Sequence, residues 1–95
     1  MGFEYDPTKS AANYLKHGID FDEAKELWKN VVLTIPSSSH VEEARWLVIG
    51  RIRGKHWTAI IADRNFAKRI ISVRRSRKLE RELYEKSCKD HSQRT

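Results

Sequence analysis

The sequence is poor in the residues that build disulfides and membrane spans. It contains a single cysteine, Cys88, which excludes an internal disulfide and a cysteine-rich zinc site. No apolar run approaches the roughly 20 residues of a membrane span. The N-terminus MGFEYD lacks the basic-then-apolar order of a signal peptide. We therefore expect a cytoplasmic protein that does not contact a membrane.

Familiar catalytic motifs are also missing. The chain has no HExxH, no paired CxxC, no phosphate-binding glycine loop and no GxSxG, and its 4 histidines are scattered. We expect neither a metal nor a cofactor, so any chemistry must come from ordinary side chains.

Acidic residues are outnumbered by basic ones, 13 against 19, which gives a formal charge of +6 and a pI near 9.7. This balance points towards nucleic acid, an acidic protein or an anionic surface, without choosing among them. The length of 95 residues suits one domain with a modest core. We expect that domain to span residues 1–88, with residues 89–95 as a polar tail that frays.

Two helices are predicted near the N-terminus. Asp6 followed by Pro7 suits a helix start, and Gly18 after two cations suits a helix end. Asp20 and Glu23 have capping-box spacing and begin a second, short helix. Its apolar face is formed by Phe21, Ala24, Leu27 and Trp28. The two helices should form a hairpin.

Four strands are predicted in the middle of the chain, at residues 31–35, 45–51, 57–62 and 69–75. Turns containing Gly54 and residues 63–67 should join the last three strands into an antiparallel meander. Residues 37–40 read as a flexible loop. The predicted fold class is α+β, with the N-terminal helix hairpin and a C-terminal helix packed on an antiparallel sheet.

The sequence KRIISVRR, residues 68–75, runs from an apolar strand into a cluster of arginines. Strict alternation would place Ile70, Ser72 and Arg74 on one face and send Arg75 in the opposite direction. Arginine in the first turn of the following helix is unfavourable for the helix dipole, which suggests that an anionic ligand compensates. A solvated basic edge with nothing bound is the alternative.

The last helix should begin after an N-cap at Ser76. Leu79 and Leu83 lie four residues apart, so we expect both to face the sheet. Lys78 and Glu82 have the spacing of a helix-surface ion pair, as do Arg81 and Glu85.

Cationic side chains collect near the strand ends and turns: Arg51, Arg64, Arg69, Arg74 and Arg75. Such a set can act on RNA without a metal, because the 2′-hydroxyl is a built-in nucleophile. The protein must then place the phosphate, stabilise its charge in the transition state and move protons. The candidates for proton transfer are His17, Lys16, Tyr84 and Glu80.

Each candidate also has a purely structural interpretation. His17 lies one residue before Gly18, where a cation commonly interacts with the helix dipole. Tyr84 suits the edge of a core equally well, and Arg64 beside Asp63 suits a surface ion pair. Trp46 and Trp57 are more easily explained as core residues than as platforms for bases.

Three segments together resemble the BrnT family of type II toxin–antitoxin systems: FEYDPTKSAANYLKHGIDFDEA, RWLVIGR and ADRNFAKRIISVRRSRKLERELYE. The resemblance covers nearly the whole chain except its tail. It implies a RelE-like fold and a metal-independent endoribonuclease toxin that cleaves RNA and arrests translation. The implied partners are RNA and a ribbon-helix-helix antitoxin (BrnA-like), with operator DNA met only through the antitoxin.

The resemblance also implies roles for single residues. Arg64, Arg69 and Arg74 would grip the scissile phosphate and stabilise its developing charge, and His17 would transfer protons. The residues expected to bind the rest of the RNA are Lys16, Arg51, Arg75 and Arg77. Ile61 and Ala62 depart from the family pattern, which often has Tyr-Thr there. A rival hypothesis follows from this departure: a catalytically weak toxin homologue that serves as an antitoxin-binding module in operon autoregulation.

Overall fold

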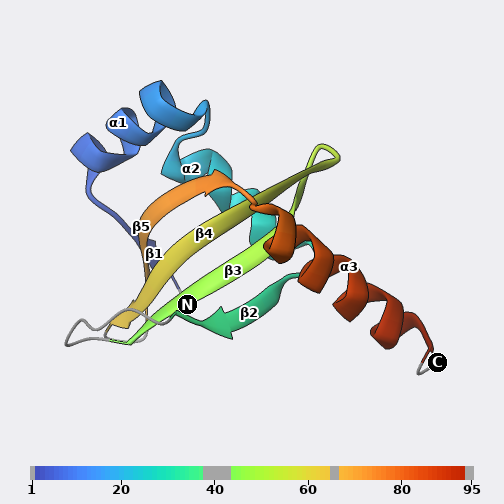
Figure 1. Ribbon diagram of the computed structural model, residues 1–95. Helices are drawn as coiled ribbons and strands as arrows, with labels where there is room; N and C mark the ends of the chain where they lie inside the picture. Colours follow the sequence, from blue (N-terminus) through green and yellow to red (C-terminus); the bar gives the residue numbers. More distant parts are fainter. Residues whose placement is uncertain (1, 38–43, 65–66, 94–95) are drawn as a thin grey trace.

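The computed structural model describes residues 2–37, 44–64 and 67–93, apart from the side chains of Arg64 and residues 90–93. Most of the loop predicted at residues 37–40 and the middle of the turn predicted at 63–67 therefore lie outside the described residues. Within them the chain forms one five-stranded sheet in the order β1-β5-β4-β3-β2. Helices α1 and α2 lie together on one side of the sheet, and α3 extends from its end (Figure 1). The predicted α+β class is confirmed.

Local capping chemistry sets the N-terminal helices, as the sequence predicted. Helix α1 (Pro7–His17) begins after Asp6, whose carboxylate accepts from Thr8 N at 2.8 Å. It ends at Gly18, which has a φ of 80° and donates its N–H to Tyr14 O. A full capping box between Asp20 and Glu23 starts α2 (Phe21–Ala24). The second helix then tightens into the 3₁₀ helix η1 (Lys25–Lys29).

The core lies between the sheet and these N-terminal helices. Phe21, Ala24 and Leu27 are all buried there, as the predicted apolar face requires, and Trp28 packs against them. The sheet contributes Trp57, Ala59, Ile61, Ile70 and Val73 to the same cluster. Trp57 is therefore a core residue, and Trp46 packs against the core from its edge.

The predicted strands are present, with adjusted ends: β2 (Leu33–Pro36), β3 (Arg45–Ile52), β4 (Lys55–Arg64) and β5 (Ala67–Arg75). All three pairings among them are antiparallel. Arg53 and Gly54 form the β3–β4 turn with φ values of 50° and 80°, as in a two-residue hairpin. A fifth strand, β1 (Phe3–Glu4), pairs parallel with β5, so the sheet is not wholly antiparallel as predicted.

The alternation predicted for β5 is wrong at one residue. Pairing with β4 shifts between Ile60 and Ile61: Ile60 pairs with Ser72, but Ile61 pairs with Ile70. Ile71 is thus the extra residue of a β-bulge. Because a bulge resets the alternation, Ile70 joins Val73 in the core instead of sharing a face with Ser72.

Helix α3 (Lys78–Gln93) packs on the sheet through a different face from the predicted one. Leu79 is 65% exposed and Leu83 is 39% exposed, whereas Glu80 and Tyr84 are buried. The buried residues of α3 are four positions apart, as predicted, but they are Glu80 and Tyr84 and not Leu79 and Leu83. The carboxylate can be buried because partners from β4 and β5 satisfy it, as described below.

The start of α3 also differs from the prediction. Ser76 is not the capping residue; Arg77 precedes the helix, and its N–H donates to the side chain of Glu80 at 2.8 Å. The helix continues to Gln93, beyond Cys88. No helix in the described part of the chain is long and apolar enough to cross a membrane.

Candidate functional site at the junction of β5 and α3

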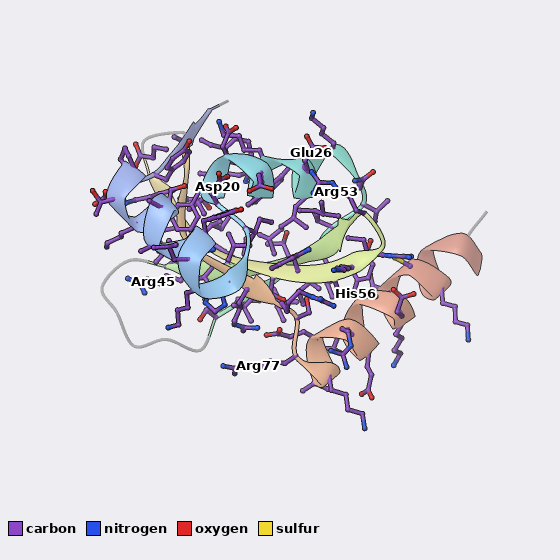
Figure 2. The ribbon with its side chains drawn as sticks, turned by 90° about the horizontal axis from the view of Figure 1, so that it is seen from above. Asp20, Glu26, Arg45, Arg53, His56 and Arg77 are labelled. Atoms are coloured by element: carbon purple, nitrogen blue, oxygen red, sulfur yellow. The ribbon has the colours of Figure 1, made fainter. Side chains whose placement is uncertain are left out.

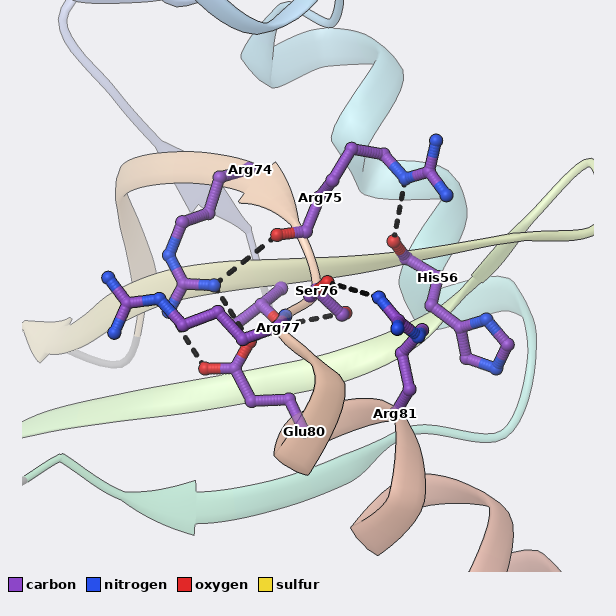
Figure 3. Close-up of polar contacts among 8 residues, drawn as sticks. His56, Arg74, Arg75, Ser76, Arg77, Glu80 and Arg81 are labelled. Carbon is purple, nitrogen blue, oxygen red and sulfur yellow. Dashed lines mark hydrogen bonds and ion pairs between the residues drawn. The ribbon is translucent and has the colours of Figure 1, made fainter.

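Arg74 and Glu80 form the central contact of the junction between β5 and α3. Arg74 Nη1 donates to Glu80 Oε1 at 2.7 Å, and Nη2 donates to Oε2 at 2.8 Å, so the two planar groups meet edge to edge (Figure 3). Nη1 also lies 3.4 Å from the carbonyl of Arg75. The side chains are only 18% and 10% exposed. Both ends of the pair are therefore held in one geometry.

Glu80 collects further hydrogen bonds that keep it ionised. Its Oε1 accepts from the backbone N–H of Arg77 at 2.8 Å and from the hydroxyl of Thr58 at 3.0 Å. Burial favours the neutral carboxyl, but these bonds and the one from Arg74 outweigh it and lower the pKa of Glu80 to about 2. Glu80 is thus an anion at neutral pH, which makes it a poor candidate for the proton-transfer role that the sequence left open.

Next to the Arg74–Glu80 pair, Thr58 and Ser76 link β4 to the connection between β5 and α3. Thr58 is completely buried on β4, and its hydroxyl lies 2.8 Å from that of Ser76. Ser76 N donates to His56 O at 3.0 Å, so the connection after β5 stays attached to β4. The buried polar groups satisfy one another, which fixes the angle at which α3 leaves the sheet.

The neighbouring arginines point away from this pair. Arg75 lies on the opposite side of β5, where its guanidinium stands 5.4 Å from the ring centroid of Trp57 and its Nε donates to His56 O at 3.2 Å. Arg77 extends into solvent at the start of α3 (Figure 2). Arg81 donates to Ser76 O at 3.0 Å. The junction thus presents several cations around one neutralised pair.

Arg69 lies further along β5, on the same face as Arg74. It pairs with Ala62, and Arg74 pairs with Thr58, both of which alternate with the core residues of β4. Its contact with Glu4 is long, at 3.5 Å, and its side chain is 31% exposed. Ser72 lies between the two arginines on this face and is half-buried.

His17 and Lys16 lie at the C-terminal end of α1, beside β5. They line a hollow of about 220 Å³ together with Lys9, Asn13, Ile71 and Ser72. Helix α1 is fixed here because Asn13 donates to Val73 O at 2.9 Å and accepts from Val73 N at 3.2 Å. The hollow thus brings His17, as a predicted site residue, next to the strand that carries Arg69 and Arg74.

Arg51 and Tyr84 lie apart from that hollow. They line a second one, of about 430 Å³, with Val31, Arg53 and Cys88. Tyr84 OH donates to Val31 O at 3.0 Å. Burial, and then the contact with Cys88, raises the pKa of Tyr84. Tyr84 therefore matches the core-edge interpretation, and Cys88 lies against it.

Sequence reasoning missed one pair of titratable groups. His56 Nε2 lies 2.7 Å from Glu85 Oε2, and the imidazole meets the ring of Tyr84 edge-on at 5.6 Å between centroids. The sequence predicts that Glu85 pairs with Arg81 along the helix, but Arg81 donates to Ser76 O instead. His56 lies 29 positions from Glu85, and no residue near either one indicates the pairing. The pair forms only because α3 packs against β4.

Ile61 and Ala62, which motivated the rival hypothesis, are 2% and 0% exposed. Ile61 belongs to the core between sheet and helices. The departure from the family pattern therefore falls on buried positions.

The fold and site define a small basic α+β protein with a cluster of arginines at the junction of β5 and α3. Comparison with known families agrees: the profile of the ribonuclease toxin BrnT of type II toxin–antitoxin systems matches residues 5–80. The chain belongs to the BrnT toxin family, and its function is that of a ribonuclease toxin acting with an antitoxin. No match was found among curated proteins or among solved structures.

Proposed function

We propose that this toxin cleaves RNA without a metal, at a site on the face of β5 that carries Arg69 and Arg74. The supporting observations are their alignment on one face and the position of His17 in a hollow at the edge of the same strand, which Ser72 from that face also lines. Thr58 and Ile49, next to α3, are buried on this face, whereas Leu47 and Ile60 are half-exposed. An RNA strand can therefore approach the arginines from the part of the sheet that α3 leaves open.

The reaction follows from what these groups can do. The 2′-oxygen attacks the adjacent phosphorus and the bond to the 5′-oxygen breaks, which leaves a 2′,3′-cyclic phosphate and a 5′-hydroxyl. Arg69 and Arg74 stabilise the charge that develops on the phosphoryl oxygens. His17 moves the proton from the 2′-hydroxyl or to the leaving oxygen. Arg64, at the end of β4, joins the phosphate-binding set on the strength of the sequence pattern.

Further cations would hold the RNA on either side of the scissile phosphate. Arg77 lies at the start of α3, Arg75 lies at the end of β5 on its other face, and Lys16 lies in the hollow beside His17. Arg51 lies towards the β3–β4 hairpin and would contact a more distant phosphate. Backbone contacts of this kind supply affinity without reading sequence.

The family resemblance extends the proposal to the fold class and the partner. We assign the sheet with its flanking helices to the RelE-like class and the antitoxin to the ribbon-helix-helix class (BrnA-like), which would bring operator DNA only indirectly. RNA and antitoxin would both be met in the cytoplasm. No observation favours the weak-homologue alternative, because its motivating residues are buried.

The direct test is cleavage of a 5′-labelled RNA oligonucleotide by the purified protein in excess EDTA. We expect cleavage, with a 2′,3′-cyclic phosphate on the 5′ fragment, and no cut where the 2′-hydroxyl is replaced by hydrogen. His17→Gln should slow the reaction about 100-fold. Lys29→Gln, which removes a surface cation paired with Glu26 on η1, is the matched control and should cleave as the wild type does. Activity that returns only with Mg²⁺ would refute metal independence.

A further inference from the structure

We infer that Glu80 is a positioning residue for catalysis: it holds one edge of the Arg74 guanidinium so that the other edge, Nε–H with the second Nη2–H, meets the scissile phosphate. The inference rests on the proposed function and assigns a role to the contact within that same site. The sequence indicates Glu80 only as a candidate for proton transfer and not as a positioning residue.

The donor inventory of Arg74 supports this arrangement. A guanidinium has five N–H donors in a fixed plane. Glu80 takes one hydrogen from Nη1 and one from Nη2, and the carbonyl of Arg75 lies near the other hydrogen of Nη1. Two parallel donors remain, on Nε and Nη2, which is the geometry that matches two phosphate oxygens.

Nε on the remaining edge is not sealed inside the protein. Nε of Arg74 donates to no residue that the structure describes. It is not a buried unpaired atom either, since within the described side chains those are Arg45 Nε and Trp46 Nε1. With the side chain 18% exposed, the edge is neither satisfied internally nor closed to solvent.

Glu80 is in turn too firmly held to move with the ligand. Its carboxylate accepts from Thr58 on β4 and from the N–H of Arg77 at the start of α3, in addition to Arg74. These partners come from three consecutive parts of the fold. The guanidinium plane is therefore fixed before RNA arrives, which is the condition for strong stabilisation of a transition state.

Electrostatics distinguishes this role from simple attraction of RNA. A carboxylate beside a phosphate-binding arginine repels the phosphate, so a site selected for affinity alone would not contain it. An oriented donor pair, by contrast, contributes most when charge develops on the phosphoryl oxygens. Glu80 should thus favour turnover at the expense of binding.

Steady-state cleavage by Glu80→Gln in EDTA tests whether Glu80 acts on turnover and not on RNA binding. We expect kcat to fall about 100-fold while KM stays equal or decreases, because the repulsive charge is lost together with the fixed orientation. Glu26→Gln makes the same substitution in the surface pair with Lys29 and should match the wild type. Thermal melting of each variant shows that it is folded at the assay temperature. An unchanged kcat, or a rise in KM alone, would overturn the inference.

A second pair of variants separates orientation from stability. Arg74→Lys keeps the charge but has no second edge, and its kcat should also fall about 100-fold. The exchange Arg74→Glu with Glu80→Arg restores an ion pair and should recover part of the melting temperature without recovering cleavage. Recovered cleavage in the exchanged protein would contradict the role of Glu80.

One measurement does not depend on cleavage. The ¹⁵Nε–¹H NMR signal of Arg74 should shift when wild-type protein is titrated with a 2′-O-methyl RNA oligonucleotide, which cannot react. The signal should broaden in Glu80→Gln. If the signal does not move while other signals report binding, the inference fails even when the protein is an active metal-independent ribonuclease.

Discussion

Arg69 and Arg74 lie on the same face of β5 although they are five positions apart in the sequence. An odd separation normally puts two side chains on opposite faces of a strand. Here the bulge at Ile71 inserts one residue and reverses the alternation. The bulge is therefore the feature that brings the two arginines of the proposed phosphate site to one face.

The alignment predicts a difference between two neighbouring cations. Arg69→Gln should relieve growth arrest and RNA loss after induced expression, because removing an oriented charge from the transition state costs about 100-fold in rate. Its stability should change little, since the contact with Glu4 is 3.5 Å long. Lys68→Gln changes the adjacent residue, which alternation directs away from that face, and should remain toxic at matched protein level. Equal toxicity of both variants would remove Arg69 from the site.

Glu80 should make folding stability depend on acid pH. Its pKa is about 2 in the folded protein against an ordinary value of 4.5. A group with a lowered folded pKa stabilises the protein above its unfolded pKa, and that contribution is lost as the pH falls from about 4.5 towards 2. The full contribution is on the order of 3 kcal/mol. Melting curves between pH 7 and pH 2.5 should show a steeper acid loss for the wild type than for Glu80→Gln; parallel curves would contradict the assignment.

Asn13→Ala should be among the more damaging single changes in α1. The side chain satisfies both backbone groups of Val73 and also donates to Ile19 O at 2.8 Å. Removing it leaves buried polar groups without partners, at a cost of about 2 kcal/mol or more in the free energy of unfolding. Asn30→Ala, which loses one exposed contact of 3.5 Å, is the comparison and should cost much less. Urea denaturation of both variants measures the difference.

Helix α3 offers a test of which face packs on the sheet. Tyr84→Phe removes the hydrogen bond to Val31 O from a buried ring and should cost about 1 kcal/mol. Leu79→Gln alters a residue that is 65% exposed and should change the free energy of unfolding by less than about 0.5 kcal/mol. The reverse order would mean that the leucine face packs on the sheet in solution.

The features that were predictable from sequence are those decided by neighbouring residues. Asp6 and Gly18 bracket α1 through contacts within one turn, and Asp20 caps α2 in the same way. The four principal strands likewise follow from runs of β-branched and apolar residues. These signals were sufficient for the α+β class.

The remaining features depend on contacts between distant residues. The bulge at Ile71 is defined by pairing with β4, so a single strand read alone gives the wrong face for Ile70. The inward face of α3 was missed because Glu80 becomes buried only when Arg74 and Thr58 satisfy it. The pair of His56 and Glu85 has the same origin. The sequence supplied the cationic residues of the proposed site, but it did not indicate that Glu80 pairs with Arg74.

The contact between Asn13 and Val73 has a consequence for the edge of the sheet at β5. The amide side chain occupies both backbone hydrogen-bonding groups that Val73 would offer to an incoming strand. Asn13 of α1 thereby covers the edge of β5 at Val73, and β1 covers the same edge at Lys68 and Arg69. At these residues a strand from a second copy of the chain finds no free backbone groups on β5 to pair with, which opposes edge-to-edge association there.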